Sequence, residues 1–470
     1  MNKIVKMALC GALSFSFAFA AAGCFKSYEN PGANIAVDAN ISKDYAGEIT
    51  VATGAGYIAD MRSVIEEFNK EYPNIKVNTQ AQPDLSESIL RWHNADLSKP
   101  GSCPDIFLNE GQMWVSLREG EILKDLTPYV NASFENGTLD KEDIVPEIWR
   151  LGKDGYKEDG NQYFIPTNYD QFVAIINTTI LTQLGIPLPD KDWTWTECVE
   201  ILRQVKEGYN DLVSNSLPWS QTGIPATMSL QSDAMMYAMY KSFGVEFFDE
   251  NNQPIFDNAN TRKAMEFMKS LVTAGYCNPN LELPIASGQV AIQFQSRPAI
   301  VDMLEEAPQA EFPETGYFTV NDIDIWPMPV MDVEGSSGQT YVGGGTIGYA
   351  MYSRTDEPNA AWAFLRFLIS EKAYEVYGSG KNIPILKSMQ EDENALWRKL
   401  PREGMYQEAF ICYPERFTPA SFHMGMPSKI RSEIYNIMIQ MNLDGIKGTK
   451  GIDETIADAV KKVNYQLSRV

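Results

Sequence analysis

The residues of this chain that could do chemistry are aromatic and acidic rather than nucleophilic or metal-binding. The 470 residues include 9 Trp, 22 Tyr, 22 Phe and 62 Asp and Glu, but only two histidines, His93 and His423. Neither histidine has a partner at metal-ligand spacing, and no G-x-S-x-G or G-x-x-x-x-G-K-[ST] motif occurs. We therefore expect no triad or zinc-hydrolase chemistry, no catalytic residues, no cofactor and no metal ion. Carboxylate pairs for glycoside hydrolysis stay open, because such pairs are distant in sequence.

One motif matches a nucleotide-binding pattern. The segment "GGGTIG", Gly343 to Gly348, fits G-x-G-x-x-G. A dinucleotide site requires a strand before this pattern and a helix after it. The residues that follow, "YAMYSR", alternate like a strand instead. We therefore predict that these glycines allow the backbone to come close to a ligand or to a neighbouring segment.

Aromatic residues in loops, with polar residues beside them, suit a sugar. A sugar has one flat apolar face and a rim of hydroxyls. Its site needs Trp or Tyr for stacking, and Asp, Glu, Asn, Gln or Arg for hydrogen bonds. Most aromatic residues must still belong to the core, and Trp195 and Trp362 lie on the apolar stripes of predicted helices.

Charge and cysteine usage exclude further classes. The net charge of −23 makes nucleic-acid binding unfavourable, because phosphate contacts need Lys and Arg. The cysteines after the N-terminal region are widely spaced and form no C-x-x-C, so a structural zinc site is not expected. An exported protein could pair them, but free or buried thiols are favoured. These cysteines are Cys103, Cys198, Cys277 and Cys412.

The N-terminus has the pattern of an export signal. Lys3 and Lys6 precede an uncharged run that is shorter than the roughly 20 apolar residues needed to span a bilayer. Its end, Ala21-Ala22-Gly23-Cys24, resembles a bacterial lipobox, with Ala21 where Leu is usual. We predict a lipoprotein signal peptide over 1–23, lipidation of Cys24 and a flexible tether over 24–46. An ordinary signal peptide or an uncleaved anchor are the alternatives.

The first folded segment predicts parallel strands. In "GEITVATGAGYIADMRSVIEEFNKEYPNIKVNTQAQ", a strand around Ile49 and Val51 precedes an apolar stripe at helical spacing. Pro73 ends this helix, and the next strand follows. Such a βαβ unit implies a parallel pair with a right-handed crossover. "PDIFLNE" then predicts a third strand.

A second α/β region follows. Phe172 to Ile176 is an apolar run that suits a buried strand, and Thr194 and Glu197 have the spacing of a capping box. Pro358 is placed near the first turn of a later helix. Two helices close the chain, with Gly445 as the predicted stop between them.

In this order, the segments resemble the extracellular solute-binding proteins of sugar ABC importers, the maltose-binding-protein-like family. "FNKEYPNIKVNTQ", "PDIFLNEGQMW" and "GEILKDLTPYV" are similar to its first passages. "YFIPTNYDQFVAIINTTILTQLGIPLPDKDWTWTECVEIL" is similar to its hinge strand and following helix, and "YVGGGTIGYAMYSRTDEPNAAWAFLRFLIS" to its return strand. "SGQVAIQFQSRPAI" departs from the family's usual Gly-Trp segment. The likeness covers nearly the whole chain from about residue 48.

The resemblance implies an α/β, two-lobed fold of the type II periplasmic-binding-protein kind, with a ligand cleft between lobes joined by a multi-strand hinge. Crossings between the lobes are expected near residues 168–172, 340–345 and 378–384. Lobe one is expected at 47–169 and 345–380, and lobe two at 170–344 and 381–470. Ligands in open α/β sheets bind beyond the carboxyl ends of strands, which points to the same loops.

The candidate ligand-binding residues are chosen from these loops and crossings. For stacking we choose Tyr57, Trp114, Tyr169 and Trp219, and for binding hydroxyls Glu110, Asp170 and Arg297. The remaining candidates are Asn109, Gln295 and Gly344. Arg297 and Pro298 replace the family's usual Gly-Trp on their side of the pocket.

The resemblance implies a binding protein, not an enzyme. We expect a monomer, held by its lipid on the outer face of the cytoplasmic membrane. It would capture a carbohydrate, an oligosaccharide, by hinge closure and deliver it to ABC permease subunits. Three alternatives stay open: the same fold with a peptide, polyamine or metal chelate as ligand; a sensor subunit; and a secreted glycosidase.

Overall fold

The computed structural model describes residues 29–82, 84–110, 113–212, 224–230, 232–281, 284–306, 322–377, 381, 383–399, 404–419 and 426–470. Its strands are β1 (Gly47–Gly54), β2 (Ile75–Gln82), β3 (Ile106–Glu110), β4 (Ile165–Asn177), β5 (Ala226–Thr227), β6 (Ile292–Ser296), β7 (Ile323–Trp326), β8 (Val342–Met351), β9 (Ile383–Pro384) and β10 (Phe417–Pro419). Trp219 and Cys24 lie outside the described residues.

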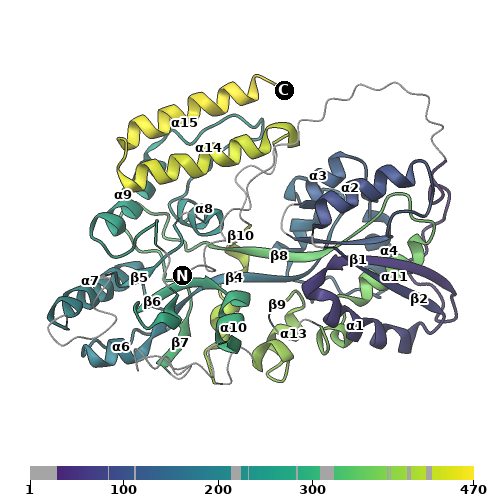
Figure 1. The fold of residues 1–470 in the computed structure, drawn as a ribbon, viewed down its shortest axis with the longest axis horizontal. Helices are drawn as coiled ribbons and strands as arrows, with labels where there is room; N and C mark the ends of the chain where they lie inside the picture. Colours follow the sequence, from purple (N-terminus) through teal and green to yellow (C-terminus); the bar gives the residue numbers. More distant parts are fainter. Residues whose placement is uncertain are drawn as a thin grey trace, which may run out of the picture.

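The helices pack around these strands in two lobes (Figure 1). They are α1 (Ile58–Glu71), α2 (Leu85–Asp96), α3 (Met113–Glu119), α4 (Thr127–Glu135), α5 (Pro146–Trp149), α6 (Thr178–Gln183), α7 (Trp195–Leu212), α8 (Asp233–Ser242), α9 (Ala259–Thr273), α10 (Arg297–Glu306), α11 (Pro358–Phe367), α12 (Glu371–Tyr374), α13 (Lys387–Glu391), α14 (Ser428–Lys447) and α15 (Ile452–Leu467). The α/β, two-lobed fold predicted above is confirmed.

One sheet runs through both lobes. Its strand order is β2-β1-β3-β8-β4-β6-β5, with β10 beside β8, and β7 and β9 beside β4. The pair β1–β2 is parallel, as the βαβ pattern predicted, and the pair β1–β3 is parallel as well. Strand β4 crosses the molecule: residues up to Gln171 pair with β8, and residues from Phe172 on pair with β6.

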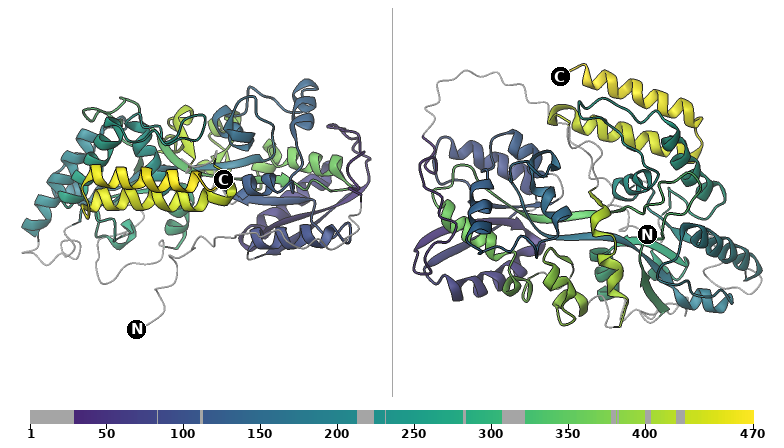
Figure 2. Two further views of the ribbon diagram at one scale, coloured as in Figure 1. Left: turned by 90° about the horizontal axis from the view of Figure 1, so that it is seen from above. Right: turned by 180° about the vertical axis from the view of Figure 1, so that it is seen from behind.

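The predicted helix signals are largely confirmed. The backbone N–H of Thr194 donates to Glu197, and the N–H of Glu197 donates to the Thr194 hydroxyl, which makes the expected capping box of α7. Trp195 and Trp362 are fully buried core residues. Gly445 was the wrong stop: α14 continues to Lys447 and ends at Gly448, whose φ of 67° suits glycine. Helices α14 and α15 then lie side by side on the outside of lobe two (Figure 2).

The structure corrects two of the predicted segment boundaries. From Glu29 on, the expected tether packs against lobe one, and Ala39 and Ile41 are buried in the core. The segment from β9 to α13, expected in lobe two, is hydrogen-bonded to lobe one, where Val145 donates to Ile385 and Lys387 donates to Asp143 through their backbones. Otherwise the residue boundaries of the lobes stay a prediction.

Candidate ligand site at the junction of the lobes

The candidate residues come together along the strands that the two lobes share. Strand register places Glu110 beside Ile347, Asp170 beside Gly345, and Phe172 beside Ser296. Because Ile347 also pairs with Asn168, these pairs meet β4 at residues 168, 170 and 172, and they step diagonally across one face of β3, β8, β4 and β6. Tyr57 lies just after β1, in the short 3-10 turn Ala55–Tyr57 that leads into α1. We call the group Tyr57, Glu110, Asp170, Gln295 and Ser296 the junction strip.

Tyr57 and Glu110 form the lobe-one end of the junction strip. The Tyr57 hydroxyl donates to Glu110 Oε1 at 3.1 Å. Tyr57 is half-buried and Glu110 is exposed, so both residues keep accessible surface. Burial, followed by the negative charge of Glu110, raises the pKa of Tyr57, and the phenol therefore stays protonated at neutral pH.

Asp170 occupies the centre of the junction strip, where β4 changes partners. The backbone N–H of Gly345 donates to Asp170 Oδ1 at 2.7 Å. Burial raises the pKa of the Asp170 carboxyl, and hydrogen bonds from the Gly345 backbone and the Ser296 side chain oppose this rise. Its side chain is nevertheless partly exposed. Asp170 is thus an oriented carboxylate with acceptor capacity left for a ligand.

Gln295 closes the lobe-two end of the junction strip. Its Oε1 accepts a hydrogen bond from the backbone N–H of Ser296 at 2.8 Å, and both residues are half-buried. Sequence reasoning missed Ser296 because it chose the charged neighbour, Arg297. The period of two along β6 could not have found it from Gln295, because adjacent residues of a strand face opposite sides of the sheet. Only the pairing of Ser296 with Phe172, two residues from Asp170, places Ser296 on the Asp170 side.

Three residues that were predicted to contact the ligand are buried by neighbouring side chains. In this arrangement they cannot touch a ligand directly, which corrects the prediction for them. Trp114 is 1% exposed and stacks on Phe164, with ring centroids 6.2 Å apart. Tyr169 is 1% exposed and accepts a hydrogen bond from Gln390 through its hydroxyl. Both rings are covered by protein and offer no open face for stacking.

Arg297 is the third covered residue. It is 0% exposed, donates to Gln407 Oε1 at 3.1 Å and to the Trp397 carbonyl, and lies between two aromatic rings. Its guanidinium carbon is 5.3 Å from the centroid of the Trp397 ring and 4.8 Å from that of Phe410. Burial lowers the pKa of Arg297 to about 9, so it is still a cation at neutral pH.

Asn109 and Gly344 also have structural roles. Asn109 is fully buried, and its Nδ2 donates to the Phe107 carbonyl. A Cβ added at Gly344 would lie 1.9 Å from the carbonyl oxygen of Asp170. The glycine motif therefore lets β8 approach its neighbours closely, which confirms one of the two predicted roles, and β8 continues through it as a strand.

The lobes also touch away from the shared strands. Arg431, on α14, donates to Ser116 Oγ at 3.0 Å and pairs with Glu119 at 2.6 Å, both on α3. Arg431 is nearly buried. No sequence signal indicates this contact, because α3 and α14 are far apart along the chain.

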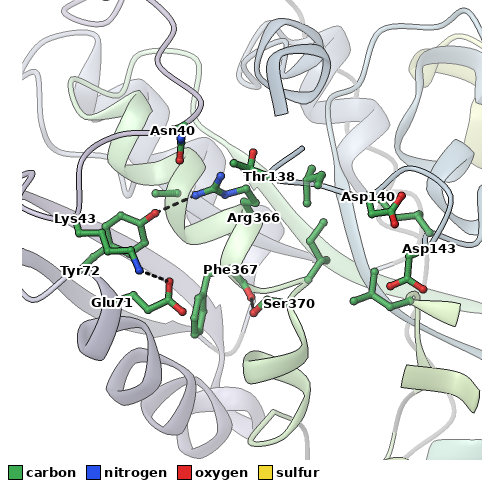
Figure 3. A pocket seen from close by; sticks show the side chains of 15 residues that line it. Asn40, Lys43, Glu71, Tyr72, Thr138, Asp140, Asp143, Arg366, Phe367 and Ser370 are labelled. Carbon is green, nitrogen blue, oxygen red and sulfur yellow. Dashed lines mark hydrogen bonds and ion pairs between the residues drawn. The ribbon is translucent and has the colours of Figure 1, made fainter. Parts of the chain in front are cut away.

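A separate cavity of about 360 Å³ lies in lobe one (Figure 3). It is lined by the ends of α1 and α11 and by the loop after α4, and Arg366 reaches across it to the hydroxyl of Tyr72 at 3.0 Å. Lys43 forms an ion pair with Glu71 at its edge. Since this cavity lies away from the strand ends and within one lobe, it does not fit the site expected for this fold.

No group of three or more His, Cys, Asp or Glu residues that could hold a metal ion occurs in the described part of the chain. Its four cysteines are free; Cys412 is half-buried and the others are buried. Over the same residues, no helix combines the length and the apolar character needed to cross a membrane.

Comparison with known proteins identifies the family. Residues 51–375 match the family of bacterial extracellular solute-binding proteins. The chain therefore belongs to this family, as the sequence analysis predicted. A curated relative, the arabinooligosaccharide-binding protein of Halalkalibacterium halodurans, is 26% identical over 339 residues, which is 70% of this chain and 69% of that protein.

Solved structures share the fold. An ABC substrate-binding protein from Listeria monocytogenes in complex with cycloalternan has a TM-score of 0.65 at 18% identity, covering 90% of this chain and 100% of that one. UgpB from Mycobacterium tuberculosis in complex with glycerophosphocholine has a TM-score of 0.64 at 17% identity, covering 90% and 99%. At these identities the likeness concerns the fold.

Proposed function

We propose that this protein is the substrate-binding subunit of an ABC importer and that it binds an oligosaccharide at the junction strip. One observation carries the proposal: the half-buried Tyr57, the exposed Glu110 and the oriented Asp170 lie along the strands that both lobes share. Membership of the solute-binding family and the similarity to an arabinooligosaccharide-binding protein support it.

Four residues of the junction strip take part in binding. Asp170 accepts hydrogen bonds from sugar hydroxyls, and such charge-assisted bonds are stronger than neutral ones. Glu110 does the same from lobe one, and Tyr57 offers its ring to the flat face of a sugar. Gln295 contributes an amide from lobe two. A ligand that contacts both ends of the junction strip stabilises the closed arrangement of the lobes.

The closed protein then delivers its ligand to a membrane permease and does not convert it. Cys24 carries the lipid that holds the monomeric protein on the outer face of the cytoplasmic membrane. The extracellular character of the family supports this location.

The test is thermal unfolding of the protein after partial unfolding and refolding, which strips any bound ligand, against a panel of mono- and oligosaccharides. A ligand that binds only the folded state raises the melting temperature as its concentration passes its dissociation constant. Asp170→Asn should weaken this rise, and Asp159→Asn, at an exposed position outside the junction strip, should not. A flat panel, or recovery of a cleaved sugar, would contradict the proposal.

A cationic solute such as a polyamine is the second candidate, because Glu110 and Asp170 are both carboxylates. The two candidates differ in their response to salt. Affinity for a cation falls steeply as ionic strength rises, whereas affinity for a neutral sugar changes little. The same carboxylates disfavour a phosphodiester such as the ligand of UgpB.

A further inference from the structure

The segment that follows the predicted lipid site does not hang free of the protein. Residues 29–46 run along the outer edge of lobe one, beside α4 and α11 (Figure 1). We call this segment the clasp. Its contacts fall into three groups, which are spread along its whole length.

The first group fastens the start of the clasp to the turn after β8. Asn30 donates through Nδ2 to the carbonyl of Ser353 at 3.1 Å, and Arg354 donates to the carbonyl of Glu29 at 3.4 Å. Gly32 is buried against this turn, and a Cβ added to it would lie 2.0 Å from the carbonyl oxygen of Thr355. Only glycine permits this approach without displacement of the chain.

The second group centres on Asn359, in the first turn of α11. Its Nδ2 donates to the carbonyl of Ala36, and its Oδ1 accepts from the backbone N–H of Asp38, both at 3.1 Å. The hydroxyl of Tyr129, on α4, donates to the same Oδ1 at 2.8 Å. The side-chain amide of Asn359 thus forms two hydrogen bonds with the clasp backbone, one as donor and one as acceptor, as a neighbouring strand would.

The third group buries the end of the clasp. Ala39 and Ile41 are 6% and 4% exposed and belong to the main core. The Tyr45 hydroxyl donates to Glu357 Oε2 at 2.8 Å. Burial, together with this hydrogen bond to a carboxylate, raises the pKa of Tyr45 to about 12.

The clasp shortens the reach of the anchor. Five residue steps separate Cys24 from Glu29, and a chain of that length spans at most about 18 Å. A free tether from residue 24 to 46 would span up to about 79 Å by the same rule. Whatever conformation the five steps take, the turn at Ser353 stays within a short distance of the lipid.

We propose that the clasp fixes the orientation of the membrane-bound protein. The edge of lobe one formed by residues 353–359 faces the lipid surface, and lobe two with α14 and α15 points away from it. The inference rests on the proposed anchor at Cys24, but not on the identity of the ligand. Its partner is the bilayer to which the lipid belongs.

The experiment uses the full chain, purified with its lipid and reconstituted in phosphatidylcholine vesicles that contain an acceptor dye on the headgroups. A donor dye is placed at Asp356, beside the clasp, or at Tyr465, on α15, both of which are exposed. Energy transfer to the membrane should be several-fold more efficient from position 356 than from 465. Gly32→Ala should reduce this difference, because its methyl group cannot fit against Thr355.

The matched control is Gly451→Ala, whose added Cβ would meet no atom within 4 Å and which should leave the difference unchanged. Equal transfer from the two positions in the unaltered protein overturns the proposal. So does an unchanged difference in Gly32→Ala, or a mature chain whose mass shows no lipid on Cys24. Sugar-dependent thermal stabilisation of the same samples reports on the proposed function separately, so that either idea can fail alone.

Discussion

Asp170, on β4, and Arg297, directly after the neighbouring strand β6, are ionisable side chains whose surroundings differ in kind. Asp170 keeps part of its surface exposed and accepts hydrogen bonds from the Gly345 backbone N–H and the Ser296 side chain. Arg297 is fully buried, between two aromatic rings and two oxygen acceptors. The Asp170 carboxyl thus keeps accessible surface, whereas the Arg297 guanidinium is enclosed by its protein partners.

The difference follows from where each residue sits in its segment. Asp170 lies within β4 at the point where the strand changes partners, so its side chain faces the line between the lobes. Arg297 is the first residue of α10, where the chain turns away from β6 and directs the side chain toward Trp397. A charged residue near the junction of the lobes can therefore contact a ligand only if the local backbone directs its side chain toward that junction.

Removal of Arg297 should give the largest effect, and it should be on stability. Arg297→Ala leaves the Trp397 carbonyl and Gln407 without their donor and opens space between two rings. We expect the free energy of unfolding to fall by roughly 3 kcal/mol, measured by urea denaturation. The sugar affinity of the remaining folded protein should be unchanged. A large loss of affinity at unaltered stability would mean that Arg297 contacts the ligand after all.

Asp170→Asn should have the opposite signature. The loss of a charge-assisted hydrogen bond should weaken sugar binding roughly 10- to 100-fold, measured by titration calorimetry. Stability should not fall. An unchanged affinity would remove Asp170 from the site.

The pH dependence of Asp170→Asn sharpens the same distinction. Because burial raises the pKa of Asp170, the folded state binds more protons than the unfolded state between the ordinary and the raised pKa. Stability contributed by this group therefore falls as pH rises through that window. The Asn variant lacks this fall, so it should gain stability relative to the unaltered protein at neutral pH and not at low pH. Melting temperatures of both proteins, measured from about pH 3 to about pH 8, give this difference in stability.

Tyr57→Phe should give the smallest effect. It keeps the ring for stacking and loses only the hydroxyl bond to Glu110 at the surface, so affinity should change by less than about threefold. Tyr57→Ala removes the ring and should cost more. If the two variants bind equally well, the ring does not stack on the ligand.

Much of the fold follows from local pattern. The stripe of α1 and the stop at Pro73, the parallel β1–β2 pair, the strand character of Gly343–Gly348 and the capping box at Thr194 are all properties of short segments. Hydrophobic periodicity and turn-forming residues act over a few neighbouring positions, so they can be recognised in the sequence alone. The same holds for Tyr57 and Asp170, whose positions next to strand ends or crossings made them candidates.

Other features were decided only by the tertiary structure. Sequence spacing could not tell that Trp114 would lie against Phe164, that Arg297 would turn into the core, or that residues 29–46, polar in composition, would find Asn359 and Thr355 as partners. Burial and pairing depend on residues more than 100 positions away in most of these cases. The sequence by itself thus determined the elements and the class of protein, while long-range packing decided which polar side chains remain free to meet a ligand.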